Sequence, residues 1–123
     1  MFRFQNLDIW QRGTDVVVRS FRLADFLDQQ RMYRFAEQVR SASLSITNNI
    51  AEGSGSLSNN EFRNFLNIAR RSTFETANMC LTIPKIGLTS QERMMPLVGQ
   101  LDELSRMILE FHRQIPRNPS RRR

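Results

Sequence analysis

The stretch that determines the fold runs from Ser58 to Gly87 and reads SNNEFRNFLNIARRSTFETANMCLTIPKIG. Its apolar and small residues recur at alternating spacings of four and three, at Phe62, Leu66, Ala69, Thr73, Thr76, Cys80 and Ile83. This is the period of an α-helix that buries one side. Ser58 and Glu61 have the spacing of a capping box, and Pro84 and Gly87 are typical of a helix end. The stretch predicts a long amphipathic helix.

Three further segments show helical periodicity, and no segment alternates as a β-strand does. They span about residues 8–26, 28–52 and 89–115. The first carries two neighbouring apolar stripes, which are Trp10, Thr14, Val17, Phe21 and Ala24 in one and Ile9, Val16 and Leu23 in the other. Four amphipathic helices with short connections predict an all-α protein. We expect an antiparallel up-down-up-down four-helix bundle over residues 1–116.

The ends of these helices carry more specific predictions. Gly53 follows the helix of residues 28–52 directly, so we expect it to adopt the left-handed C′ conformation and to stop that helix. Thr89 and Glu92 have the spacing of a second capping box. The last helix either continues through Pro96 with a mild kink, which we favour, or begins at Pro96.

Composition narrows the class of protein. The chain has 123 residues, 40% of them hydrophobic and 24% charged, which suits one folded domain. A single cysteine, Cys80, excludes an internal disulfide framework and a thiolate zinc site. With one histidine and one cysteine, a metal site would have to consist of carboxylates alone, and we expect no metal and no cofactor. Because neither a membrane span nor a signal peptide is evident, we expect a cytoplasmic protein without a membrane partner.

The formal net charge of +6 is unevenly distributed. Seventeen of the 18 basic residues are arginines. Residues 117–123 hold four of them and no acid, which leaves 14 basic against 12 acidic residues elsewhere. We expect this tail to be disordered, and two interpretations stay open for it. Either Arg117, Arg121, Arg122 and Arg123 contact nucleic-acid phosphates, or the tail is only a solubilising end.

A resemblance enters at residues 38–53, QVRSASLSITNNIAEG. This stretch resembles the signature of the four-helix-bundle proteins encoded by intervening sequences of bacterial 23S ribosomal RNA genes. The likeness covers about residues 4–113 and implies a four-helix subunit; related proteins assemble into five-membered rings. It implies no chemistry, because the family has no established activity. A more distant likeness is to the accessory variability determinant of diversity-generating retroelements, which looks like a basic pentamer that binds nucleic acid and a reverse transcriptase.

The apolar faces independently favour an oligomer. The helix of residues 8–26 is apolar over a wide arc, and the helix that follows Ser58 carries Phe65, Ile68 and Met79 beside its main stripe. A helix in a monomeric bundle needs only one buried stripe. We therefore expect a homo-oligomer, for which the number five comes only from the resemblance.

One group of polar residues has two interpretations. Asn49 and Glu52 share a helix face near Gly53, whereas Arg40 does not share it, and Glu75 flanks the stripe of the following helix. They form either a polar recognition site or, as we favour, a set of groups that hydrogen-bond the backbone around the turn.

The function that these observations favour is a non-catalytic scaffold or adaptor that binds RNA or DNA phosphates through arginines. The candidate arginines on the bundle are Arg40, Arg63, Arg70 and Arg71. The alternative is a protein-interaction or structural module without nucleic-acid binding. A third, less favoured interpretation is a small helical ribonuclease that uses Arg106 and His112. These two side chains lie about 120° apart on a helix, and no second group converges on them.

Overall fold

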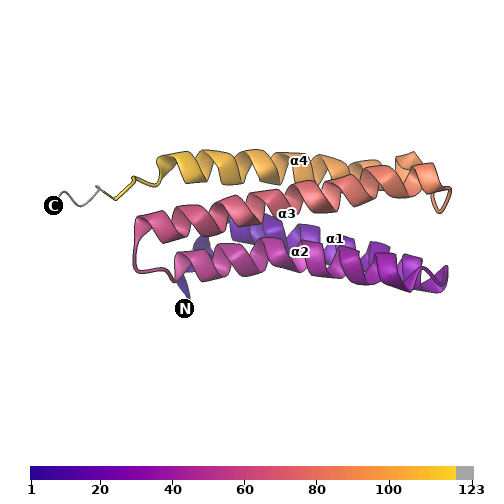
Figure 1. Ribbon diagram of the computed structural model, residues 1–123, viewed down its shortest axis with the longest axis horizontal. Coiled ribbons are helices and arrows are strands. Elements are labelled where there is room, and N and C mark those ends of the chain that lie inside the picture. The colour runs from indigo at the N-terminus through magenta and orange to yellow at the C-terminus, as the bar shows by residue number, and fades with distance from the viewer. Residues whose placement is uncertain (119–123) are drawn as a thin grey trace.

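The computed structural model describes residues 1–118, and in this range it contains helices and no strands. A short 3-10 helix, η1 (Arg3–Asn6), precedes four α-helices, which are α1 (Asp8–Gln29), α2 (Tyr33–Ser54), α3 (Asn59–Ile86) and α4 (Gln91–Gln114). The four helices lie side by side as a bundle, and the turns between them fall at alternating ends of it (Figure 1). The prediction of an all-α protein is confirmed. Arg121, Arg122 and Arg123 of the predicted tail lie outside the described residues.

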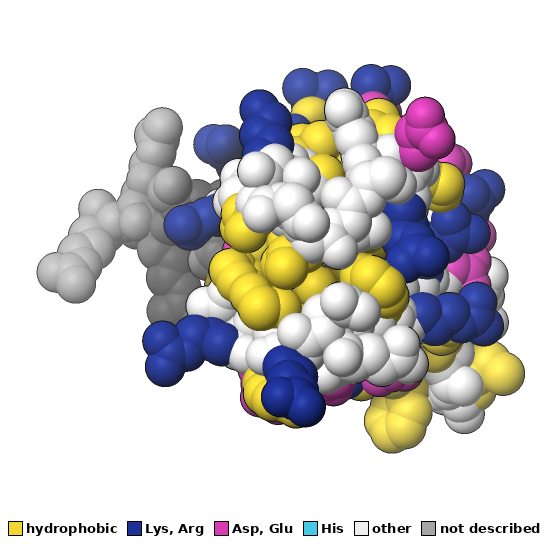
Figure 2. All heavy atoms as spheres, turned by 90° about the vertical axis from the view of Figure 1, so that its right-hand side faces the viewer, with side chains coloured by type: hydrophobic (Ala, Val, Ile, Leu, Met, Phe, Trp, Pro, Cys, Tyr) yellow, Lys and Arg dark blue, Asp and Glu magenta, His cyan; other side chains and the backbone are white. Residues whose placement is uncertain are grey.

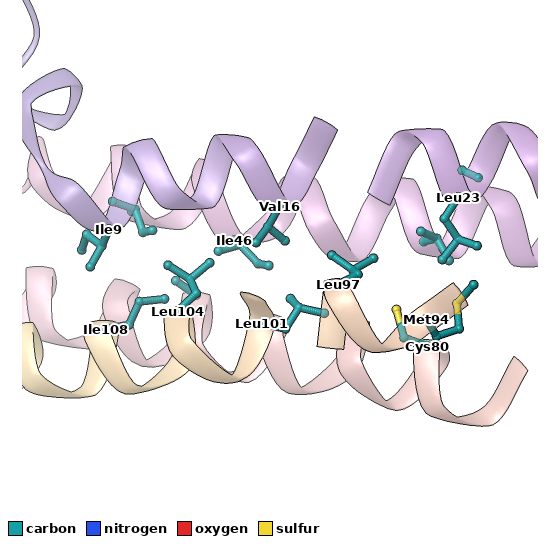
Figure 3. Packing of buried hydrophobic residues seen from close by; sticks show 14 of the residues in the cluster. Ile9, Val16, Leu23, Ile46, Cys80, Met94, Leu97, Leu101, Leu104 and Ile108 are labelled. Atoms are coloured by element: carbon teal, nitrogen blue, oxygen red, sulfur yellow. The ribbon is translucent and has the colours of Figure 1, made fainter. Parts of the chain in front are cut away.

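The core is built from the stripe that the sequence predicts for α3 and from buried apolar side chains of α4. All seven predicted positions of α3, from Phe62 to Ile83, are buried. In α4 the buried positions are Met94, Leu97, Leu101, Leu104 and Ile108. Figure 3 shows these α4 side chains pointing toward Ile9, Val16 and Leu23 of α1. Burial of these apolar surfaces is the main force that holds the helices together.

The wide apolar arc of α1 is only partly core. Ile9, Val16 and Leu23 are buried, whereas Trp10 and Phe21 of the neighbouring stripe are half-buried. The Trp10 ring lies 5.2 Å from the ring of Phe4 in η1, and the Phe21 ring lies 5.9 Å from the Arg40 guanidinium. Part of the arc that favoured an oligomer is therefore covered within the chain.

Three predicted boundaries of α1 and α2 are wrong. α1 continues to Gln29, and α2 begins only at Tyr33, after a turn in which Arg31 has a φ of 61°. Gly53 does not adopt the left-handed conformation, because α2 runs on to Ser54 and its C-cap is Gly55 with a φ of −88°. The reason for a glycine at position 53 is the close approach of α3, where Phe62 and Phe65 fill the space of a Cβ atom.

α3 begins and ends where the sequence predicts, but only one half of the Ser58–Glu61 capping box forms within the described residues, and the start of α4 is shifted by one residue. The Ser58 hydroxyl accepts a hydrogen bond from the Glu61 backbone N–H at 3.1 Å, and Gly87 ends α3 with a φ of 95°. The capping box of Thr89 and Glu92 is wrong, because the helix begins after Ser90, whose hydroxyl accepts from the backbone N–H of Arg93. α4 continues through Pro96 and does not begin there.

Candidate nucleic-acid interface

A polar hollow lies at the end of the bundle where α3 begins and α4 ends. It has a volume of about 410 Å³ and is lined by Asn60, Arg63, Asn64, His112 and Arg117. None of these lining side chains is acidic. Asn60, Arg63 and Asn64 come to the same side of α3 because residues three and four apart are neighbours on a helix surface.

Two side chains of α3 hold the end of α4 in place. The Arg63 Nη1 donates hydrogen bonds to the backbone oxygens of His112 and Ile115, at 2.8 and 2.7 Å. These carbonyls lie at a helix end, where the backbone leaves its last acceptors without partners. The Asn60 Oδ1 accepts a hydrogen bond from the backbone N–H of Asn118 at 3.0 Å. The chain after α4, including Arg117, is thereby kept beside α3.

The electrostatic environment of His112 shows the excess of positive charge at this end. Burial lowers the pKa of His112 from its ordinary value of 6.5, and the positive charges of four arginines lower it further. These arginines are Arg63, Arg117, Arg113 and Arg70, in order of effect. This lower pKa favours the neutral form of His112 at pH 7. An anion placed in the hollow would offset this concentration of like charge.

The predicted arginines of α3 have different surroundings. The Arg70 Nε donates to the backbone oxygen of Ser105 at 3.3 Å, and its guanidinium lies 4.9 Å from the centre of the Phe74 ring. Arg71 is exposed. Arg63 and Arg70 therefore both lie along the junction of α3 and α4. Arg117 lines the polar hollow together with Arg63. The sequence reasoning missed Asn60, Asn64 and Arg113, although Asn60 lies three residues before Arg63, and Asn64 and Arg113 directly follow Arg63 and His112.

Arg40 is engaged elsewhere. Its Nη2 donates to Asp28 Oδ2 at 2.6 Å and to Asp25 Oδ1 at 2.9 Å, and these hydrogen bonds raise the pKa of Arg40. The three residues join α1 to α2. Two carboxylates on one guanidinium compete with a phosphate, so this surface is less suited to an anion than the hollow.

The structure does not assemble Arg40, Asn49, Glu52 and Glu75 into one site. Asn49 donates from Nδ2 to the backbone oxygen and the hydroxyl of Ser45, at 2.7 and 3.0 Å. Glu52 and Glu75 are exposed, and within residues 1–118 neither forms an ion pair. Asn49 thus bonds to groups of its own helix one turn back. Within residues 1–118 none of the four side chains hydrogen-bonds the backbone of the turn after α2, so the favoured interpretation is wrong for these residues.

Three other kinds of feature bear on the function: the Arg106–His112 ribonuclease pair, a metal site and a membrane span. Arg106 pairs with Asp102 at 2.8 Å, so its guanidinium is already held by a carboxylate of its own helix. No three His, Cys, Asp or Glu side chains gather as metal ligands within residues 1–118. Over the same range, no helix has the length and apolar character needed to cross a membrane.

Together these features define a small four-helix protein whose last two helices carry a basic surface. The chain belongs to the 23S rRNA-intervening sequence protein family, which it matches over residues 5–110. The resemblance stated from residues 38–53 is thereby confirmed. The family's description names the gene context and no activity.

A solved structure of similar fold supports the four-helix architecture. It is the crystal structure of a protein of unknown function from the S23 ribosomal protein family of Bacteroides thetaiotaomicron. The two chains share 21% sequence identity and superpose with a TM-score of 0.82, over 86% of this chain and 99% of the other. At this identity the likeness establishes the fold alone. No curated protein matches the chain.

Proposed function

We propose that this protein is a non-catalytic, homo-oligomeric scaffold that binds the phosphate backbone of RNA or DNA. The observation that carries the proposal is the hollow between α3 and α4, where His112 lies within the field of four arginines. The subunit in this proposal is an antiparallel up-down-up-down bundle, which the alternating turns in Figure 1 support.

The hollow offers the chemistry that phosphate recognition requires. Guanidinium groups bind phosphate oxygens with two parallel hydrogen bonds, and the amides of Asn60 and Asn64 supply further neutral donors. Contacts of this kind position a nucleic acid without reading its sequence. We favour binding over cleavage because, among the described residues, no carboxylate or second histidine lines the hollow to share acid–base chemistry with His112.

An apolar hollow between the middle of α3 and the first half of α4 supports the oligomer. It has a volume of about 500 Å³, and its lining includes Phe74, Leu81 and Met95, which are 56, 45 and 44% exposed. Exposed apolar side chains that gather around a hollow are typical of a protein interface. We propose that a second copy of the chain packs here, in the five-membered ring that the family resemblance implies. Such a ring would multiply weak phosphate contacts.

The sequence predicts an oligomer partly from Phe65, Ile68 and Met79, and only one of these three side chains is exposed. Ile68 is 43% exposed, whereas Phe65 and Met79 are half-buried. Phe65 packs beside Gly53, and Met79 packs against the core. Of the exposed apolar residues of α3, Phe74 and Leu81 line the apolar hollow, whereas Ile68 lies about 120° from Phe74 around the helix and is not part of its lining.

Fluorescence anisotropy across a salt series tests the nucleic-acid proposal, with structured RNA, duplex DNA and single strands as probes. The test variant is Arg113→Gln/Arg117→Gln, and the matched control is Arg34→Gln, an exposed arginine of the first turn of α2. For duplex DNA the logarithm of affinity falls by about 0.9 per neutralised phosphate and decade of salt. We expect the slope of log affinity against log salt to decrease, in the test variant, by roughly the amount that two phosphate contacts contribute. The control should keep the slope of the unaltered protein.

Three other results would contradict the hollow as the site. Absence of binding at low salt would end the nucleic-acid proposal. Binding that Arg121→Gln/Arg122→Gln/Arg123→Gln abolishes, while the hollow variant keeps it, would assign nucleic acid to the tail. Equal losses per charge removed in the test variant and in Arg34→Gln would show that only net charge matters.

Light scattering tests the oligomer. We expect a mass of five times the 14.5 kDa chain, and smaller species when Leu81 and Met95 are both replaced by Glu. A single-chain mass for the unaltered protein would refute the oligomer. The apolar hollow is also the observation that favours the second candidate function, a protein-interaction module. Binding of a protein partner that survives high salt, in the absence of any nucleic-acid binding, would favour that function.

A further inference from the structure

A second hollow with a basic rim lies at the opposite end of the bundle, between α1 and α4. It has a volume of about 280 Å³ and is lined by Arg19, Arg22, Leu23, Phe26, Arg93, Met94 and Leu97. We propose that it binds a small amphipathic anion, in which a carboxylate or phosphate is attached to an apolar chain or ring. This site is separate from the phosphate surface at the other end of α4.

The floor of the hollow is apolar and belongs to the core. Leu23 is 8% exposed, and Met94 and Leu97 are each 3% exposed. Leu23 belongs to α1, and the other two belong to the first two turns of α4. Such a floor offers no hydrogen bonds, so it suits the hydrocarbon part of a ligand and not a fully hydrated inorganic ion.

The rim of the hollow is positively charged. Arg19 and Arg22 lie three residues apart on α1, and Arg93 faces them from α4. The guanidinium of Arg93 lies 4.6 Å from the centre of the Phe26 ring, which holds this charge at the mouth of the hollow. Figure 2 looks onto this end of the bundle and shows hydrophobic side chains at the centre, with Lys and Arg side chains around them.

These three arginines lack acidic partners within the part of the chain that the structure describes. No carboxylate lines the hollow, and no ion pair in residues 1–118 involves Arg19, Arg22 or Arg93. Farther along the same junction of α1 and α4, Arg12 does pair with a carboxylate, that of Glu103, at 3.1 Å. The arrangement at Arg19, Arg22 and Arg93 thus leaves room for an anionic group that the protein does not itself supply.

Octanoate is a suitable probe for this chemistry, used with the full-length protein and below the concentration at which octanoate forms micelles. Methyl NMR of Met94, Leu97 and Leu23 reports the site, and calorimetry reports the affinity. We expect octanoate and octyl phosphate to shift these methyl signals with saturation. Acetate lacks the apolar part and 1-octanol lacks the charge, so we expect each to bind at least tenfold more weakly.

Variants separate a specific site from hydrophobic adhesion. We expect Arg22→Gln/Arg93→Gln to weaken octanoate binding at least tenfold, while Arg34→Gln leaves it unchanged. Arg22 and Arg93 are both exposed, so replacing them should leave the core intact. The circular dichroism spectrum of the variant checks that the helices remain. Octanoate affinity should also be unaffected by Arg113→Gln/Arg117→Gln, so the result does not depend on nucleic-acid binding.

The inference fails if octanol binds as tightly as octanoate, or if Arg22→Gln/Arg93→Gln binds octanoate as the unaltered protein does. Methyl shifts confined to Leu81 and Met95 would place the probe in the other apolar hollow and also overturn the assignment. Saturable octanoate binding with equal strength for octyl phosphate would support the site and leave both anionic head groups as natural candidates. A clear preference between the two would identify the head group.

Discussion

Gly53 of α2 lies so close to Phe65 of α3 that a Cβ atom at Gly53 would stand 2.7 Å from the Phe65 Cβ. The Phe62 Cδ1 would be 2.9 Å from the same atom. Real Cβ atoms do not approach other atoms so closely, and the Phe65 Cβ cannot move without its backbone. The helices α2 and α3 therefore reach their observed separation only because position 53 has no side chain.

The variant Gly53→Ala tests this close approach. Overpacking of this kind lowers the free energy of unfolding by about 1–3 kcal/mol, and the higher helix propensity of alanine returns at most ~1 kcal/mol. We expect a net decrease, measured by urea denaturation at a fixed chain concentration.

The matched control is Gly99→Ala in α4. A Cβ atom there meets nothing within 4 Å in its own chain, so within the subunit only the helix propensity changes. Because Gly99 also lines the apolar hollow, both glycine variants are compared in the Leu81→Glu/Met95→Glu background, which removes the proposed contact between copies. We expect the free energy of unfolding to rise by roughly 0.5–1 kcal/mol. Equal stabilisation by both substitutions would show that the contact between Gly53 and Phe65 is not tight.

The variant Arg63→Gln should loosen the last turn of α4. It removes the two hydrogen bonds from Nη1 to the carbonyls of His112 and Ile115. Hydrogen bonds from a charged donor contribute about 1.5–3 kcal/mol, so the free energy of unfolding should fall by an amount in this range. Amide hydrogen exchange would show faster opening at the end of α4. The control Arg71→Gln, an exposed side chain of the same helix, should change stability by less than about 0.5 kcal/mol.

The protonation of His112 should couple to both stability and anion binding. Because burial and the neighbouring arginines lower its pKa below 6.5, the unfolded chain binds this proton more readily than the native protein does. The contribution of His112 to stability is therefore present at neutral pH and is lost as the pH falls below 6.5 through the native pKa. The variant His112→Gln should remove this part of the pH dependence.

An anion in the hollow should reverse the shift. A bound phosphate group raises the pKa of His112, so binding takes up a proton and becomes tighter as the pH falls. The His112 ring signals in an NMR titration, with and without a short single-stranded oligonucleotide, measure this directly. An unchanged pKa on binding would place the nucleic acid away from His112.

The thiol of Cys80 should be unreactive in the folded protein. It is fully buried in α3, and burial raises its pKa to about 11. Because the thiolate is the reactive form, a disulfide reagent at pH 8 should label the native protein only through unfolding. Labelling should become fast in denaturing urea, and rapid labelling without denaturant would contradict the packing of α3 against the core.

Much of the fold was predictable because its signals are local. The three- and four-residue spacing of Thr73, Thr76 and Cys80 predicts a buried face, and all three residues are buried. Polar Thr73 and Thr76 fit this face because their hydroxyls bond to backbone oxygens of their own helix. Ser58 and Gly87 mark the ends of α3 through hydrogen bonding and backbone conformation that depend on only a few neighbouring residues.

The sequence by itself determined the four amphipathic helices and the chain's family, whereas tertiary structure decided which polar residues meet. Arg63 and His112 lie 49 residues apart, and no periodicity predicts that one holds the backbone of the other. The role of Gly53 was misjudged for the same reason, since a glycine after a helical pattern looks like a local stop, although the space beside it belongs to α3. The helical period arises from interactions within one turn of the chain. Which group a charged side chain contacts, and what fills the space beside a glycine, depend instead on which helices pack together.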